Sequence, residues 1–177
     1  MSVTSELKPV ADFSSEERTA VRELKAAVYP DRPEGYPGRD RQWDAPRWGV
    51  LVTAGDILVS YTGVVERAAA VDGRPTTIGG VGGVATHPSH RGRGYAPLGI
   101  GRALDFLLRR DVAFALLVCR DELVDYYSDL GWSLFPGTVY NTQFGEREVF
   151  IFNRVMVGDL TASAPTSGTI DLRGPAW

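Results

Sequence analysis

The chain has 177 residues, a formal net charge of −3, 44% hydrophobic residues and 23% charged residues. This length and composition predict one globular domain with an apolar core, and they argue against a disordered chain or a coiled coil. The charge balance argues against nucleic-acid binding, which depends on clustered Lys and Arg. The lone cysteine, Cys119, cannot form an internal disulfide, and no apolar run reaches the ~18 residues of a membrane span. We therefore expect a soluble, cytoplasmic protein that binds neither nucleic acid nor membrane.

In chain order, residues 3–12 predict a short edge strand. A helix is expected to begin at Ser14, because a hydroxyl cap is followed by acidic residues and then by an apolar stripe at Val21, Leu24 and Val28. Pro30 ends this helix. Residues 29–48 are rich in Pro and Gly and predict a long irregular loop, a type of loop that is often functional in a compact domain.

From residue 48 onward, the apolar pattern alternates between the periods of strands and helices. An antiparallel meander is expected first, with turns at Gly55-Asp56 and Asp72-Gly73. The later elements are a helix that ends near Arg109-Arg110, a strand, a short helix stopped by Gly131 and two further strands. The expected strands are 48–52, 57–65, 76–86, 112–118, 133–139 and 148–157, and the last helix is 121–130. This order predicts a mixed α+β fold.

The most informative stretch is residues 81–96, VGGVATHPSHRGRGYA, which predicts a strand, a tight basic turn and a helix N-terminus. Glycines at positions 92 and 94 let successive backbone N–H groups point at one anion, and the helix adds its own unpaired donors. Arg91 and Arg93 add positive charge. These features predict a pyrophosphate site, although a Gly-rich turn with a purely structural role is the alternative. A P-loop is excluded, because no Lys-Ser/Thr follows the glycines.

Three residues of this stretch, Arg91, Gly94 and Ala96, match the Arg/Gln-x-x-Gly-x-Gly/Ala motif of the GCN5-related N-acetyltransferase (GNAT) superfamily, which the chain resembles over residues 1–157. The resemblance implies a single α+β domain with a mixed, mostly antiparallel sheet flanked by helices. It also implies acetyl-CoA as the co-substrate, bound between the central strands without a metal. Residues 158–177 are expected to extend this domain near the acceptor site or a partner subunit. The implied cofactor-binding residues are Val84, Ala85, Thr86, Arg91, Gly92, Arg93, Gly94, Tyr95 and Ala96.

A second segment, residues 126–132, resembles the Tyr-x-x-x-Gly-Trp/Phe pattern of the same superfamily. The resemblance implies that Tyr127 is the general acid that protonates the departing thiolate. The alternative is an aromatic residue that packs in the core.

Within the superfamily, the C-terminal residues 171–177 and the loop at residues 29–48, which also carries acidic residues, resemble aminoglycoside 2′-N-acetyltransferases, which would make this a resistance-type enzyme. That resemblance implies a small-molecule amine as acceptor, near Trp177. The acids implied to bind its ammonium groups are Asp31, Glu34, Asp40 and Asp44. Two departures matter, because Gly82 and Pro175 stand where that family has acidic residues. Gly82 therefore lies at a position that the resemblance places beside the substrate, but it lacks the carboxylate that would act there as the general base.

The reaction implied is direct transfer without an acyl-enzyme, and its general base is open. Glu66 is one candidate, with a solvated hairpin end as the alternative. His87 is another, with an ordinary loop residue as the alternative, and the terminal carboxylate of Trp177 is a third. Cys119 is expected to be a small buried residue, and two His and one Cys offer no metal ligand set.

Two further features leave alternatives open. The paired glycines at 79–80 and 82–83 predict a bulged strand that a ligand approaches closely, or close packing against a helix. The competing functions are protein or peptide N-acetylation and a non-catalytic CoA-binding sensor. A homodimer is also left open.

Overall fold

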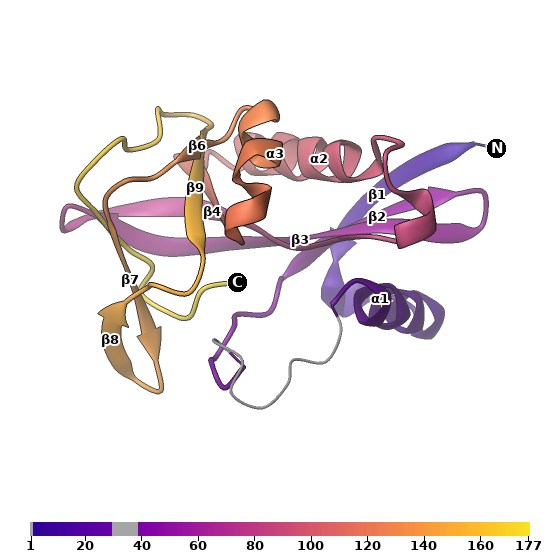
Figure 1. The fold of residues 1–177 in the computed structure, drawn as a ribbon, viewed down its shortest axis with the longest axis horizontal. Coiled ribbons are helices and arrows are strands. Elements are labelled where there is room, and N and C mark those ends of the chain that lie inside the picture. The colour runs from indigo at the N-terminus through magenta and orange to yellow at the C-terminus, as the bar shows by residue number, and fades with distance from the viewer. Residues whose placement is uncertain (1, 30–38) are drawn as a thin grey trace.

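The computed structural model describes residues 2–29 and 39–177, which form a ten-stranded mixed sheet with helices on both faces (Figure 1). In Figure 1, α2 and α3 lie above the sheet, and α1 and the C-terminus lie below it. The helices are α1 (Ser15–Val28), α2 (Tyr95–Arg109) and α3 (Val124–Asp129). The strands are β1 (Val3–Pro9), β2 (Trp48–Ala54), β3 (Ile57–Val71), β4 (Arg74–Thr86), β5 (Phe114–Cys119), β6 (Ser133–Leu134), β7 (Thr138–Gln143), β8 (Glu146–Val149), β9 (Arg154–Asp159) and β10 (Thr169–Asp171). None of the helices described here has the length and apolar character needed to cross a bilayer.

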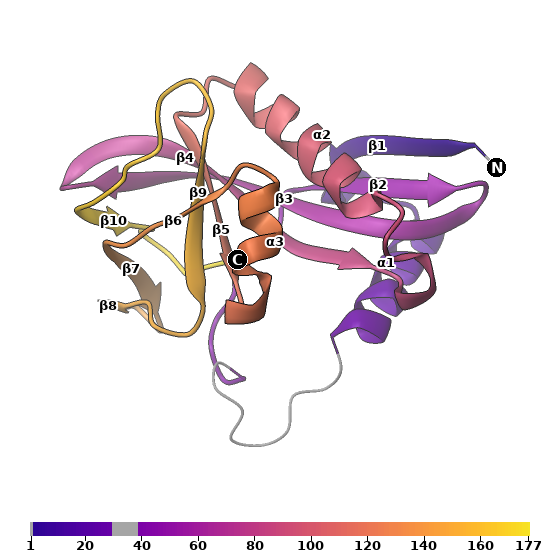
Figure 2. The same ribbon diagram turned by 45° about the horizontal axis from the view of Figure 1, so that its top comes forward.

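The long hairpin of β3 and β4 forms the centre of the sheet (Figure 2). β3 pairs with β2 along its first half and with β10 at its end. β4 pairs with β5 in parallel, and β10 pairs with β7 in parallel, whereas the other strand pairs are antiparallel. The predicted α+β class and the mostly antiparallel sheet are therefore confirmed.

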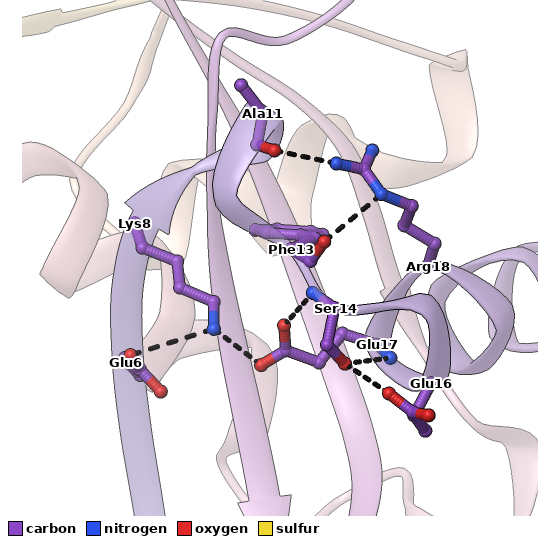
Figure 3. Close-up of polar contacts among 8 residues, drawn as sticks. All are labelled: Glu6, Lys8, Ala11, Phe13, Ser14, Glu16, Glu17 and Arg18. Atoms are coloured by element: carbon purple, nitrogen blue, oxygen red, sulfur yellow. Dashed lines mark hydrogen bonds and ion pairs between the residues drawn. The ribbon is translucent and has the colours of Figure 1, made fainter.

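The N-terminus of α1 shows how directly this sequence specifies a local structure. Ser14 caps the helix, and its hydroxyl accepts a hydrogen bond from the Glu17 amide at 3.2 Å. The Glu17 carboxylate accepts in return from the Ser14 amide at 2.7 Å (Figure 3). This reciprocal pair is a capping box, which satisfies two backbone donors that the helix itself leaves unpaired. The predicted helix start is confirmed.

The second half of the chain differs from the prediction. The stretch 133–139, expected as one strand, is split into β6 and β7, and the stretch 148–157 is split into β8 and β9. Between β6 and β7 the chain bends at Gly137, where an added Cβ would lie 2.2 Å from the carbonyl oxygen of Gly168. An alternating apolar pattern indicates extended backbone, but it does not show where a strand leaves one partner for another.

The C-terminal tail is built into the sheet, because β10 lies between β3 and β7. No strand was predicted there. Beyond β10, Trp177 is buried with its indole Nε1 3.4 Å from the carbonyl oxygen of Leu116, to which it donates. The Arg67 guanidinium holds the tail by donating to the carbonyls of Leu172 and Pro175, and it pairs with Asp44. The tail thus covers one face of the central strands.

We predict that Gly80→Ala destabilises the protein, because a Cβ on Gly80 would lie 2.2 Å from Cε2 of the Trp177 ring. Overpacking of this kind costs about 1–3 kcal/mol. Gly101→Ala is the matched control, since Gly101 is exposed on α2 with nothing within 4 Å of an added Cβ. It should stabilise the protein by about 0.5–1 kcal/mol through helix propensity. Urea unfolding measures both, and equal stability of the two variants would contradict the tight contact.

Candidate active site

The centre of the candidate site is a β-bulge near the end of β4. Tyr61 pairs with Ala85 and Gly63 with Gly82, so that Gly83 and Val84 together oppose a single residue of β3. Gly83 has a φ of +57°, which a glycine adopts without strain. The bulge expected from the paired glycines is therefore confirmed, and so is the alternative of close packing against a helix, since a Cβ on Gly79 would lie 2.5 Å from Cδ1 of Leu107 in α2.

The bulge lies beyond the point where β4 and β5 stop pairing. The last pair of their parallel ladder is Gly80 with Leu116, although β4 continues to Thr86 and β5 to Cys119. Trp177 lies at this point, because its indole donates to the carbonyl of Leu116. The end of β4 is thus released from its neighbour on one side, which leaves backbone there for other partners.

The basic turn and the α2 N-terminus follow the bulged strand, as the sequence predicted. Gly92 and Gly94 have φ angles of +74° and +79°, and Gly94 caps α2 without any side-chain hydrogen bond to the helix. Arg91 and Arg93 are exposed, and within residues 2–29 and 39–177 no carboxylate pairs with either. Free helix donors and two unpaired guanidinium groups are suited to a diphosphate.

The other expected cofactor residues take different positions. Ala85 is buried against Tyr61, and the Thr86 hydroxyl is hydrogen-bonded to that of Ser60 at 2.8 Å. The Val84 carbonyl accepts a hydrogen bond from the Tyr29 hydroxyl. The two residues that begin α2, Tyr95 and Ala96, are half-buried. Along residues 84–86, the backbone is therefore the part suited to binding a ligand.

Tyr127 lies in α3, in the core cluster beneath α2, and is only 7% exposed. Burial raises the pKa of its hydroxyl, and the nearby Tyr29 and Tyr126 raise it further. Tyr29 therefore links the bulge to Tyr127, since its hydroxyl is hydrogen-bonded to Val84 in the bulge and it lies close to Tyr127. A tyrosine in this setting stays protonated at neutral pH and has a proton to give.

Two of the three base candidates, Glu66 and His87, are bonded to other groups, whereas the terminal carboxylate of Trp177 lies at the bulged strand. Glu66 pairs with Arg110 at the end of α2, and it lies in the middle of the β3–β4 ladder, opposite Gly79, so a solvated hairpin end is wrong. The His87 Nδ1 lies 2.8 Å from the Ser89 hydroxyl and 3.3 Å from the Ser89 amide, which donates to it. Trp177 lies against the bulged strand, because a Cβ on Gly82 would be 3.2 Å from its main-chain carbon.

Cys119 is buried, and burial with Asp121 and Glu122 nearby raises the pKa of its thiol to about 11. A thiol with this pKa is almost wholly protonated at neutral pH, so it is a poor nucleophile. The expectation of a small buried residue is confirmed. In the part of the chain that is described, no three His, Cys, Asp or Glu side chains gather as metal ligands.

The acids expected to bind the substrate are not gathered at the bulge. Asp44 pairs with Arg67, and its amide donates to the Ala176 carbonyl at 2.7 Å, so it holds the tail. Asp40 is exposed in a turn. Asp31 and Glu34 lie outside the described residues.

Lys25 is a residue of the site that the sequence reasoning missed. Its ammonium lies 3.5 Å from the position that a Cβ would take on Gly83, and 4.7 Å from the centre of the Tyr61 ring. Burial lowers the pKa of Lys25 and raises that of Tyr61 to about 12. The available signal was its position next to Leu24 and four residues after Val21, on the apolar stripe of α1, where a lysine is unusual.

Comparison with known proteins identifies the family. The model of the acetyltransferase (GNAT) domain family matches residues 10–135, which is more than half of the chain. No curated protein matches. Among solved structures, the chain is similar to the Escherichia coli GNAT family N-acetyltransferase YhbS in complex with CoA, with a TM-score of 0.63 and 15% identity over 98% of this chain and 92% of that one.

Two other structures show the same fold. A GNAT family acetyltransferase from Brucella melitensis in complex with acetyl-CoA has a TM-score of 0.59 and 12% identity, over 94% of each chain. An acyl-CoA N-acyltransferase from Pseudomonas aeruginosa has a TM-score of 0.60 and 18% identity, over 89% of this chain and 99% of that one. With its bulged strand, basic turn and helix N-terminus in the expected order, the chain belongs to the GNAT acetyltransferase family.

Proposed function

We propose that the protein transfers an acetyl group from acetyl-CoA to a primary amine of a small molecule by direct attack of the amine. The observation that carries this proposal is the continuous path from the bulge at Gly83, through the turn at Gly92 and Gly94, to the N-terminus of α2, to which the cap residue Gly94 gives no side-chain hydrogen bond. The E. coli and B. melitensis structures that share the fold hold CoA and acetyl-CoA, which supports the same co-substrate here.

Each part of this path has a distinct role in the proposal. Arg91, Arg93 and the first amides of α2 hold the diphosphate, because they present unpaired donors and positive charge. The pantetheine arm follows the end of β4, where β5 no longer pairs. A backbone N–H at the bulge polarises the thioester carbonyl, as an oxyanion-hole donor does. Tyr127 donates its proton to the departing thiolate.

We place the acceptor on the face of β4 that carries Gly82 and Gly83, between Trp177 and Lys25. The Trp177 side chain lies beside Gly82 and the Lys25 side chain beside Gly83, and a Cβ on Gly82 would lie 2.9 Å from Cδ1 of Trp177. The amine must reach the thioester unprotonated. Glu66, His87 and the terminal carboxylate of Trp177 remain candidate bases. Glu66 and His87 are each bonded to another side chain, whereas the Trp177 main chain lies against Gly82.

An aminoglycoside is one acceptor class that this proposal covers, and the finer assignment needs its own test. A polycationic sugar needs carboxylates to bind its ammonium groups, and Asp44, one of the acids expected to do so, is already paired with Arg67. A smaller or less cationic amine depends less on such acids.

The test is CoA release, followed with a thiol-reactive dye, from acetyl-CoA and a panel of aminoglycosides, polyamines, amino acids and short peptides. We expect turnover with at least one small amine and little with peptides. Fast turnover of peptides would favour protein acetylation instead. Tight binding of acetyl-CoA without turnover of any amine would favour a CoA sensor, and absence of binding would overturn the proposal.

Gly94→Ala is predicted to weaken acetyl-CoA binding by about tenfold, because a Cβ at a φ of +79° disturbs the N-cap of α2 and adds bulk beside the diphosphate. Gly73→Ala is the matched control. Gly73 has a φ of +77° and equally open surroundings, but it lies in the β3–β4 hairpin turn, away from the site. Calorimetry should give an unchanged Kd for Gly73→Ala, and an equal loss in both variants would point to general destabilisation.

Tyr127→Phe should lower kcat by about 10²-fold, within the range typical of a general acid, and leave KM for acetyl-CoA nearly unchanged. Tyr126→Phe is the control, since Tyr126 is 39% exposed on the same helix. Steady-state CoA release measures both variants. Similar losses in the two variants would remove Tyr127 from the mechanism.

The pH dependence follows from the same environment. Burial raises the pKa of the Tyr127 hydroxyl above its ordinary value of 10.0, so its protonated form persists as the pH rises. We expect kcat to rise with pH as the acceptor amine loses its proton, and to show no decline up to about pH 10. A decline between pH 8 and about pH 9 would indicate a different proton donor.

A further inference from the structure

Lys25 brings a primary amine to the same place where the proposed function puts the thioester. Its Nζ lies 3.5 Å from the Cβ position of Gly83, the bulge residue, and its methylene carbon Cε lies 3.6 Å from that position. The lysine comes from α1, which covers the acceptor face of the sheet (Figure 1). The side chain therefore enters from the side on which a substrate amine would approach.

The surroundings of Lys25 favour its neutral form. Among the described residues, no carboxylate lies within ion-pair distance of its Nζ. Burial lowers the pKa of Lys25 because the charged form loses its hydration. A larger fraction of this amine is thus unprotonated at neutral pH than in an exposed lysine, and only the unprotonated amine is nucleophilic.

We propose that Lys25 is a self-acetylation site, modified by acetyl-CoA bound in the protein's own active site. The inference rests on the proposed function, because it needs the thioester at the bulge. The Lys25 nitrogen attacks the thioester carbonyl, a C–N bond forms and the C–S bond breaks. The amine loses one proton and the CoA thiolate gains one from Tyr127, which recovers it from solvent. The products are Nε-acetyl-lysine and free CoA.

The chain contains a natural control, because it has only two lysines, Lys8 and Lys25. Lys8 lies on β1, where its Nζ is 2.6 Å from the Glu17 carboxylate and 3.9 Å from that of Glu6 (Figure 3). The hydrogen bond to Glu17 raises the pKa of Lys8. Its carboxylate partners therefore favour the charged form of Lys8, whereas burial disfavours the charged form of Lys25.

The experiment incubates the full chain with isotope-labelled acetyl-CoA and no acceptor, and follows the intact mass and the two lysine peptides by mass spectrometry. We expect one acetyl group per chain, on Lys25, added at least about tenfold faster than on Lys8, because the reactants are held together. Lys25→Arg should abolish the rapid modification, and Lys8→Arg should leave it unchanged. Denatured protein should acetylate both lysines at similar rates.

Two further measurements test whether Lys25 is acetylated because it lies beside bound acetyl-CoA or only because its amine is reactive. Desulpho-CoA, a CoA analogue without the thiol, should suppress the acetylation of Lys25 by acetyl-CoA. Acetyl phosphate, which does not need the CoA site, should acetylate Lys25 in a way that desulpho-CoA does not suppress. Preference for Lys25 that desulpho-CoA leaves intact would overturn the proposal.

A separate calorimetric titration with acetyl-CoA distinguishes two kinds of failure. Tight binding with no preference for Lys25 overturns self-acetylation and leaves the proposed function standing. Absence of binding overturns both.

Discussion

The glycines of β4 are the constraint on which the rest of this structure depends. At Gly79 and Gly80, side chains from opposite faces of the sheet approach the strand, α2 from one side and Trp177 from the other. Three residues later, Gly83 forms the bulge with a φ of +57°, and Lys25 lies against it. A side chain at Gly79 or Gly80 would push away α2 or the tail, and one at Gly83 would strain the backbone of the bulge. Close packing on both faces of β4, and the bulge further along the same strand, therefore depend on glycines at these three positions.

The tail and the acceptor face are coupled through a single cation. Arg67, on β3, binds tail carbonyls, pairs with Asp44 and lies 5.2 Å from the centre of the Trp177 ring. The segment before β2 and the C-terminal tail are thus tied to the same strand, although they are far apart in the sequence. Carbonyl and carboxylate acceptors satisfy a largely buried guanidinium, which would otherwise be costly to desolvate. The walls of the proposed acceptor site are for this reason part of the folded sheet.

Four buried titratable groups of the candidate site and the core beside it share one physical property, which is that burial favours their neutral forms. The pKa of Tyr127 is raised, those of Tyr61 and Cys119 are raised to about 12 and about 11, and that of Lys25 is lowered. The main cause in each group is the same loss of hydration on burial. An amine that enters such surroundings is likewise shifted toward its neutral, nucleophilic form, so the environment itself supplies part of what a general base would do.

The sequence by itself determined the local structures whose signals lie within a few residues of one another. These include the capping box at Ser14, and the bulged strand, the basic turn and the start of α2 with Gly94 as its cap. Only the tertiary structure decided the splitting of 133–139 into two strands, the insertion of β10 and the meeting of Lys25 with Gly83. Strand partners and contacts between distant residues depend on packing across the whole sheet. Hydrophobic periodicity along the chain indicates only the type of each element, so it does not predict these partners and contacts.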